Sequence, residues 1–223
     1  MGTHTDFRQA VEHLPEAAVL VLDGISWDDY ELLLEDFAER PGMRITYNQG
    51  RLEIVTTSSE HEEWKEFILR LVQVLCEELS LNLQSYGGTT WKRKRDLKGT
   101  EADTCFYIAN AQQVIGKRAI DLLLDPPPDV VVEIDKSNQS LGKFPIYAAF
   151  GVREIWRCDV KGNAVQMFEL TGAKSYVEIP SSRSFPILTN NVLFTFIERS
   201  RTDGQMAALT AFREWLKKKS ATD

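Results

Sequence analysis

The segment that most constrains the fold is a run of three valines that ends in acidic residues. Valine occupies positions 130–132, after the triple proline of 126–128 and directly before the acidic tripeptide 133–135. β-Branched residues favour strands, and an apolar run without polar alternation is typical of a strand buried on both faces. Prolines mark a turn or break before it. The pattern therefore predicts a central strand over residues 129–135.

Helix and strand patterns on both sides of this segment follow the order of an α/β domain. Residues 60–79 carry apolar side chains with helical spacing, and Ser59 with Glu62 resembles a capping box. Further helices are expected at 30–37, 143–150, 191–199 and 206–218. Strands are expected in a hairpin at 45–54 and at 82–86, 89–95, 101–108, 152–160, 164–170 and 174–179. The fold class is therefore α/β (α+β), with a central mixed sheet.

We expect one domain over residues 1–223, because no repeat, low-complexity tract or linker interrupts the chain. Residues 1–43 form an N-terminal helical extension in this division. Residues 44–160 form the core, and 161–223 add C-terminal strands and helices.

Composition excludes several classes of protein. Hydrophobic residues make up 43% and charged residues 26% of the 223 residues, as in soluble globular chains. No stretch approaches the roughly 20 apolar residues of a membrane span. Three scattered cysteines and three histidines support neither a disulfide framework nor a zinc finger. We expect a reduced, cytoplasmic protein without a membrane partner.

The charge distribution is acidic overall and basic at one place. The net charge is −7, yet Lys92, Arg93, Lys94 and Arg95 are consecutive. Such a strip can contact nucleic-acid phosphates. It can equally be a solvated hairpin edge, where lysines hinder edge-to-edge pairing. The sequence leaves both interpretations open.

Two pairs of carboxylates occur on predicted strands. Glu101 and Asp103 are two residues apart, as are Glu133 and Asp135, so each pair is expected on one strand face. Two like charges ~5 Å apart repel by about 3 kcal/mol at an effective dielectric constant near 20. A divalent cation relieves this repulsion, and oxygen ligands favour Mg²⁺ or Mn²⁺. The alternative is that each carboxylate is solvated or paired with a nearby Arg or Lys.

Short motifs follow one another in a fixed order between residues 30 and 196. They are RITY at 44–47, GRLEI at 50–54, SEHE at 59–62, TTWK at 89–92, EAD at 101–103, FYI at 106–108, PDVVVEID at 128–135, Tyr147, and GVREIWR at 151–157. This series resembles the Uma-two family of restriction endonucleases, a branch of the PD-(D/E)XK nuclease superfamily. The resemblance implies a restriction endonuclease-like αβββαβ core and metal-dependent hydrolysis of DNA.

The resemblance also implies roles for individual residues. Asp103 matches the metal-binding aspartate, and Glu133 matches the second acidic ligand, with the Ile134 carbonyl as a further ligand. Glu60, near the start of the first core helix, is the candidate that completes the site. His61 and Glu101 are accessory candidates, and for His61 the alternative is a capping-turn histidine.

One position departs from the superfamily pattern. The lysine expected two residues after Glu133 is replaced by Asp135. Lys143, on the following helix, matches a lysine-or-arginine position that we associate with the family, and it is the candidate for a migrated catalytic lysine. The alternatives are that Lys143 is an ordinary solvated lysine, that Asp135 recruits a second metal, or that catalysis is weak.

We therefore expect an endonuclease that uses Mg²⁺ or Mn²⁺ and acts on DNA, and a homodimer by analogy with nucleases that cut duplexes. One alternative is a catalytically weak or inactive nuclease-fold module that binds nucleic acid or protein. Another is a structural protein that binds no metal.

Overall fold

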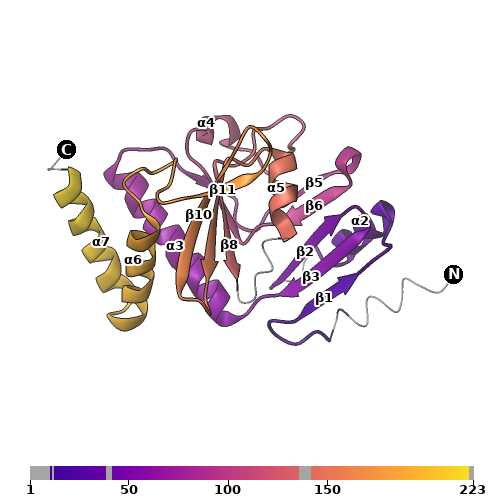
Figure 1. Ribbon diagram of the computed structural model, residues 1–223, viewed down its shortest axis with the longest axis horizontal. Coiled ribbons are helices and arrows are strands. Elements are labelled where there is room, and N and C mark those ends of the chain that lie inside the picture. The colour runs from indigo at the N-terminus through magenta and orange to yellow at the C-terminus, as the bar shows by residue number, and fades with distance from the viewer. Residues whose placement is uncertain (1–10, 12, 39–41, 136–141, 221–223) are drawn as a thin grey trace.

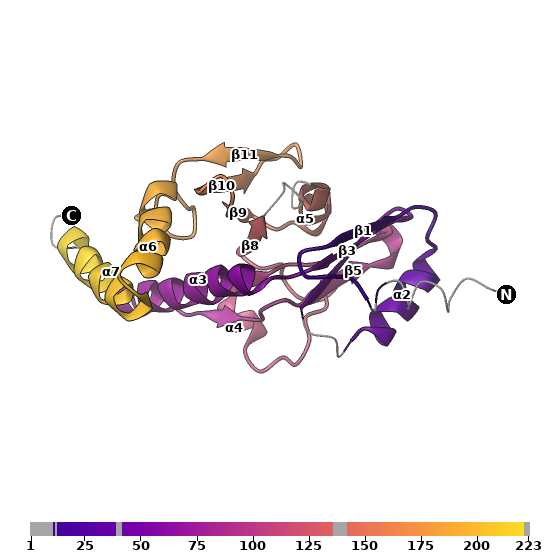
Figure 2. The same ribbon diagram turned by 90° about the horizontal axis from the view of Figure 1, so that it is seen from below.

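The computed structural model describes residues 11, 13–38, 42–135 and 142–220. Two β-sheets lie next to each other along the long axis of the molecule (Figure 1). The C-terminal helices lie at one end of the molecule, and a helix of the N-terminal part lies at the other (Figures 1 and 2).

The larger sheet contains six strands in the order β11-β10-β9-β8-β7-β4. They are β4 (Gln84–Ser85), β7 (Thr104–Tyr107), β8 (Val130–Asp135), β9 (Glu154–Asp159), β10 (Ala164–Leu170) and β11 (Tyr176–Ile179). β8 and β9 run parallel and are joined by the crossover helix α5 (Phe144–Phe150), whereas the other neighbours are antiparallel. β8 has a neighbour on each side and all of its residues are buried, which confirms the predicted central strand.

The αβββαβ order of the core is confirmed. Helix α3 (Ser59–Glu78) comes first, and the larger sheet then receives β4, β7 and β8, followed by α5 and β9. The strands between β4 and β7 belong to the smaller sheet, and β4, β7, β8 and β9 are successive neighbours in the larger one. The apolar stripe of α3 packs in one core with this sheet, α6 (Asn190–Thr202) and α7 (Gln205–Ser220). The N-cap is Ser58, whose Oγ accepts a hydrogen bond from the His61 N–H at 3.4 Å, so the predicted cap was one residue late.

The smaller sheet contains five antiparallel strands in the order β1-β3-β2-β6-β5. They are β1 (Val19–Leu22), β2 (Met43–Asn48), β3 (Arg51–Thr56), β5 (Thr90–Arg93) and β6 (Lys98–Glu101). Helix α2 (Trp27–Asp36) packs on this sheet, where Tyr30 stacks on Tyr47 with ring centroids 4.8 Å apart. A Cβ at position 99 would overlap the Tyr30 hydroxyl, so this close approach requires Gly99.

The structure differs from the sequence prediction at the strand expected over residues 101–108. The chain leaves β6 after Glu101, changes sheet at Ala102 and Asp103, and enters β7 at Thr104. β6 pairs with β2 and β5, whereas β7 pairs with β4 and β8. The predicted hairpin at 45–54 is confirmed as β2 and β3, which belong to the smaller sheet. Side-chain alternation reports local conformation and contains no information about a change of pairing partner.

The other helical elements are short. α4 (Ala111–Val114) lies between β7 and β8, and the 3₁₀ turn η1 (Lys94–Asp96) ends β5 earlier than predicted. Within the described ranges, no helix has both the length and the apolar composition of a membrane span.

Candidate active site

A small cavity lies where the two sheets meet. It is lined by Arg44, Val55, Thr57, His61, Asp103, Glu133, Ile134, Asp135 and Lys143. These side chains come from β2 and β3 of the smaller sheet, from the start of α3, from the break between β6 and β7, from the end of β8, and from the residue before α5. The cavity volume is about 20 Å³, enough for one water molecule.

Asp103 is buried in the wall of this cavity. Its Oδ2 accepts a hydrogen bond from the Ile134 N–H at 2.7 Å and lies 3.0 Å from His61 Nε2. Its Oδ1 lies 3.5 Å from Arg44 Nε. Burial raises the pKa of Asp103, but the hydrogen bond and charge of His61, together with Lys143 and the Ile134 N–H, outweigh burial and hold it below the usual value. Asp103 is therefore an anion at neutral pH.

Glu133 lies beside Asp103 in the same cavity and accepts two hydrogen bonds. Lys143 Nζ donates to Oε2 at 2.8 Å, and the Tyr147 hydroxyl donates to Oε1. Burial raises the pKa of Glu133 to about 8, because Lys143 and Tyr147 lower it less than burial and the charge of Asp103 raise it. Without a further cation, Glu133 thus holds its proton near neutral pH.

Lys143 is a buried cation and directly precedes α5. Besides Glu133, its Nζ donates to the Glu101 carbonyl at 3.0 Å. Burial lowers its pKa, but the charges of Glu133, Asp103 and Asp135 outweigh burial and raise the pKa above its ordinary value. The alternative of a solvated lysine is therefore wrong, since only 5% of Lys143 is exposed.

Asp135 shares a face of β8 with Glu133, as predicted, but it has a partner of its own. Arg157 Nε lies 2.7 Å from Asp135 Oδ2, and both side chains are buried. Arg157 comes from the adjacent strand β9. The negative charge of Asp135 is thus balanced by Arg157 without a second metal.

Two predicted residues do not bring their carboxylates to the cavity. The Glu60 carboxylate lies 3.8 Å from Arg201, and Glu60 is not among the lining residues. The Glu101 carboxylate turns into the smaller sheet, where it accepts from the Ile45 N–H at 3.2 Å and from the Thr90 hydroxyl at 2.6 Å. The prediction that Glu101 and Asp103 share a strand face is wrong, because the strand ends between them.

Arg93 differs from the other three residues of the basic strip, because its side chain is mostly buried. Its guanidinium group donates to the carbonyls of Ala149 at 3.0 Å and Leu122 at 3.3 Å, pairs with Asp96, and lies over the Phe150 ring. The Arg93 side chain is 10% exposed. It therefore connects β5 to α5, and its predicted role as a phosphate contact is corrected to a structural one.

The other three residues of the strip are more accessible. Lys92 pairs with Glu31 at 2.8 Å and Lys94 with Asp28 at 3.1 Å, and the Arg95 side chain is 70% exposed. Ion pairs between exposed side chains contribute at most about 1 kcal/mol. A phosphate can thus replace their present partners, and nucleic-acid contact by Lys92, Lys94 and Arg95 stays a prediction.

The family model Uma2, described as "Putative restriction endonuclease", matches residues 27–195. The chain belongs to the Uma2 family. Among the solved structures that match is a crystal structure titled as a putative nuclease belonging to DUF820, from Anabaena variabilis ATCC 29413. It is 15% identical with a TM-score of 0.49, over 74% of this chain and 98% of the other. No curated protein matches significantly.

Two residues of the Uma2 chain contact the acidic side chains of the cavity although sequence reasoning gave them no role there. Arg44 Nε contacts Asp103, and its Nη2 lies 3.8 Å from Glu62. Tyr147 is fully buried on α5 and holds one oxygen of Glu133. Both residues belong to the family motifs, and this membership was the signal that could have identified them. The motifs do not show which strand or helix each side chain contacts.

The donor atoms around the cavity suit a hard divalent cation. Asp103 and Glu133 supply carboxylate oxygens, and the Ile134 carbonyl lies on the same edge of β8 as its N–H, toward Asp103. Mg²⁺ is often bound by one or two carboxylates with waters in the other positions. Arg44 Nε and His61 Nδ1 are buried without a hydrogen-bond partner in the described structure, and the Arg44 N–H is a donor that suits an anion and not a cation. In the described residues, no cluster of three or more His, Cys, Asp or Glu side chains is placed to hold a metal.

Proposed function

We propose that this Uma2 protein is a metal-dependent endonuclease that hydrolyses phosphodiester bonds of DNA. Its family membership supports a nuclease-like function. The observation that carries the proposal is the convergence of Asp103, Glu133 and Lys143 in one cavity, with Lys143 Nζ 2.8 Å from Glu133. Two acidic groups and a lysine are the functional set of the superfamily that the sequence resembles.

Asp103, Glu133 and the Ile134 carbonyl would hold Mg²⁺ or Mn²⁺. When bound, the metal polarises the phosphate and lowers the pKa of a bound water. His61 holds Asp103 in place by its contact with Oδ2, and the Ile134 N–H fixes the same oxygen. These contacts leave Asp103 Oδ1 with one long contact to Arg44 and thus open to a ligand.

Lys143 supplies positive charge next to the acidic pair. Its ammonium group is buried and held by Glu133 and the Glu101 carbonyl, so little reorganisation is needed before reaction. In this position Lys143 stabilises the negative charge that grows on the phosphate oxygens in the transition state. Tyr147 anchors the other oxygen of Glu133 and so limits its rotation.

One alternative function is favoured by a specific observation. The buried carboxyl groups already have partners inside the protein, since Glu133 accepts hydrogen bonds from Lys143 and Tyr147, Asp135 contacts Arg157, and Asp103 lies near Arg44. Such a balanced site could persist in a nuclease-fold module that binds nucleic acid or protein with weak or no catalysis.

Cleavage assays separate the two functions. Supercoiled, linear duplex and single-stranded DNA are incubated with purified protein in Mg²⁺, Mn²⁺ or EDTA. We expect products in Mg²⁺ or Mn²⁺ and none in EDTA. DNA that is bound but remains intact under all conditions would contradict the nuclease proposal and support the binding module. A homodimer stays a prediction, which sedimentation of the same sample tests.

A further inference from the structure

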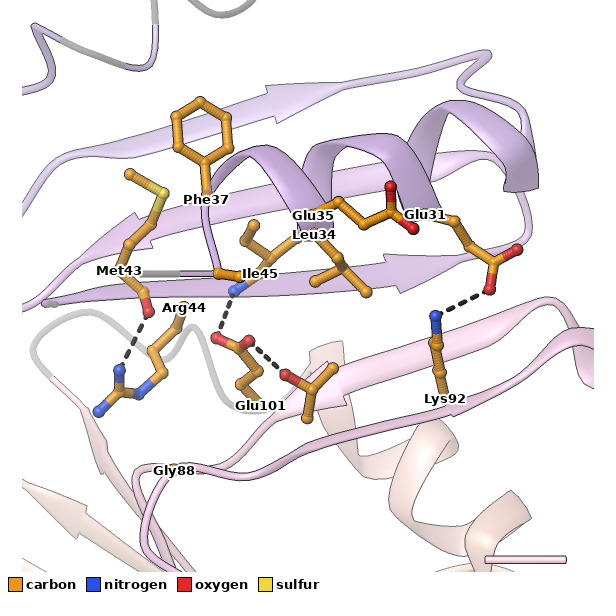
Figure 3. A pocket seen from close by; sticks show the side chains of 12 residues that line it. Glu31, Leu34, Glu35, Phe37, Met43, Arg44, Ile45, Gly88, Lys92 and Glu101 are labelled. Atoms are coloured by element: carbon orange, nitrogen blue, oxygen red, sulfur yellow. Dashed lines mark hydrogen bonds and ion pairs between the residues drawn. The ribbon is translucent and has the colours of Figure 1, made fainter. Parts of the chain in front are cut away.

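A larger pocket lies next to the candidate active site. It has a volume of about 420 Å³ and opens between α2 and the strands β2, β5 and β6 of the smaller sheet (Figure 3). Its lining residues are Glu31, Leu34, Glu35, Phe37, Ala38, Met43, Arg44, Ile45, Gly88, Thr90, Lys92 and Glu101. Small-molecule sites usually occupy roughly 300–1,000 Å³, so this pocket has the size of a ligand site.

Arg44 connects this pocket to the candidate active site. Its side chain lines both spaces, and its Nε lies 3.5 Å from Asp103 Oδ1. Gly88 lies close to its guanidinium group, where an added Cβ would be 3.2 Å from Arg44 Cζ. Arg44 is thus shared by the pocket and the cavity. A phosphate bound beside Arg44 would bring the rest of its nucleotide next to the pocket.

The lining combines apolar surface with hydrogen-bond acceptors. Leu34, Phe37 and Ile45 supply apolar surface, and the carboxylates of Glu35 and Glu101 face the same space. Ionised carboxylates accept hydrogen bonds and cannot donate them. The Glu101 carboxylate is fixed by its bonds to the Ile45 N–H and the Thr90 hydroxyl, whereas the Glu35 carboxylate has no hydrogen bond or ion pair to another described residue. The pocket therefore suits a flat apolar group that presents N–H donors.

We propose that this pocket binds one nucleobase with an exocyclic amino group, that is adenine, cytosine or guanine, taken out of the base stack beside a phosphate bound near Arg44. Glu35 accepts the amino group, as acidic side chains do from cytosine N4. The base must be extruded or single-stranded, because a stacked base cannot enter a pocket of this kind. The inference rests on the proposed function and adds to it a preference for particular bases.

The test measures binding in EDTA, where cleavage does not interfere. Fluorescence anisotropy compares oligo-dC with oligo-dT of equal length. The two bases are matched in ring size, and thymine has a carbonyl in place of the amino group, together with an N3–H and a methyl group. We expect wild type to bind oligo-dC about tenfold more tightly, the scale of one good base contact. Leu34→Trp, which fills the pocket, should abolish the preference, and Glu35→Ala, which removes the acceptor, should abolish it as well.

Matched controls come from the same chain. Leu32→Trp places the same side chain on a 46% exposed position of α2, and Glu63→Ala removes the same carboxylate from an exposed position of α3. Both should keep the tenfold preference. Melting curves verify that Leu34→Trp is folded. If it is not, Glu35→Ala still tests the pocket.

The outcomes distinguish this inference from the proposed function. Equal affinities in wild type, no binding of either oligonucleotide, or a preference that persists in Leu34→Trp or Glu35→Ala would each overturn the base pocket. If the protein still cleaves DNA, the nuclease proposal stands. Conversely, the expected preference in a protein that cleaves nothing would keep the pocket and remove the nuclease.

Discussion

Glu133 should make the metal-free protein less stable as the pH rises. Its pKa is about 8 in the folded state against 4.5 for the ordinary side chain, so unfolding releases a proton between these values. The folded state then binds more protons than the unfolded state, and the free energy of unfolding falls with pH. The contribution of Glu133 is fully present below about pH 4.5 and is lost as the pH rises through about 8. A shift of about 3.5 units corresponds to about 5 kcal/mol, which is an upper value.

Glu133→Gln isolates this effect because the amide keeps the shape and cannot titrate. Its carbonyl oxygen can still accept a hydrogen bond from Lys143 or Tyr147. Relative to wild type, the variant should gain up to about 5 kcal/mol between about pH 5 and pH 8.5 in EDTA. Urea unfolding at a series of pH values measures the difference, with exposed Glu63→Gln as the control. Parallel curves for wild type and Glu133→Gln would refute the reasoning. So would a loss of several kcal/mol in the variant at high pH, which would identify Glu133 as half of a structural ion pair.

Three further predictions concern the metal, the lysine and the basic strip. Mn²⁺ or Mg²⁺ should raise the melting temperature of wild type, because a ligand of the folded state stabilises it, and Asp103→Asn should remove most of the shift. An equal shift in both proteins would place the metal elsewhere. Lys143→Ala should lower the single-turnover cleavage rate by roughly 10²–10³-fold with little change in DNA affinity. Lys143→Arg should recover only part of the lost rate, and the control Lys161→Ala, at an exposed position, should cleave like wild type. Wild-type rates in Lys143→Ala, with Asp103→Asn inactive, would favour a mechanism that uses Asp135. Neutralising Lys92, Lys94 and Arg95 should reduce the slope of log affinity against log salt by about 0.9 for each phosphate that the strip binds in wild type. Arg93→Ala should instead lower the free energy of unfolding in urea by about 2 kcal/mol. An unchanged slope would show that the strip does not bind DNA.

The elements that the sequence predicted well are those with strong local patterns. The valine run identified β8 as central, because a strand buried on both faces leaves a continuous apolar run. The apolar stripe identified α3, because a helix buried on one face leaves a periodic pattern. The order of these elements with the family motifs placed Asp103 and Glu133 near each other, and the structure brings both to one cavity.

Features that depend on tertiary pairing were not predictable in this way. The break at Ala102 and Asp103 arises because β6 and β7 pair with different sheets, and this alone turns Glu101 away from Asp103. Glu60 and His61 are adjacent on α3, and successive helix residues point about 100° apart, so only one of them can face the cavity. The structure selects His61. The burial of Lys143 follows from the packing of α5 against β6 and β8, which no local pattern reports.

The central claim is that Asp103 lies at the catalytic metal site of a nuclease. The most direct measurement is the single-turnover rate of DNA cleavage in Mn²⁺ for wild type, Asp103→Asn and the control Asp23→Asn, whose aspartate is 75% exposed. Asn keeps the shape of Asp103 and removes the anionic ligand. The account predicts wild-type rates for Asp23→Asn and a loss of at least about 10²-fold for Asp103→Asn, the scale of one preorganised catalytic group. Equal rates in all three proteins would contradict it.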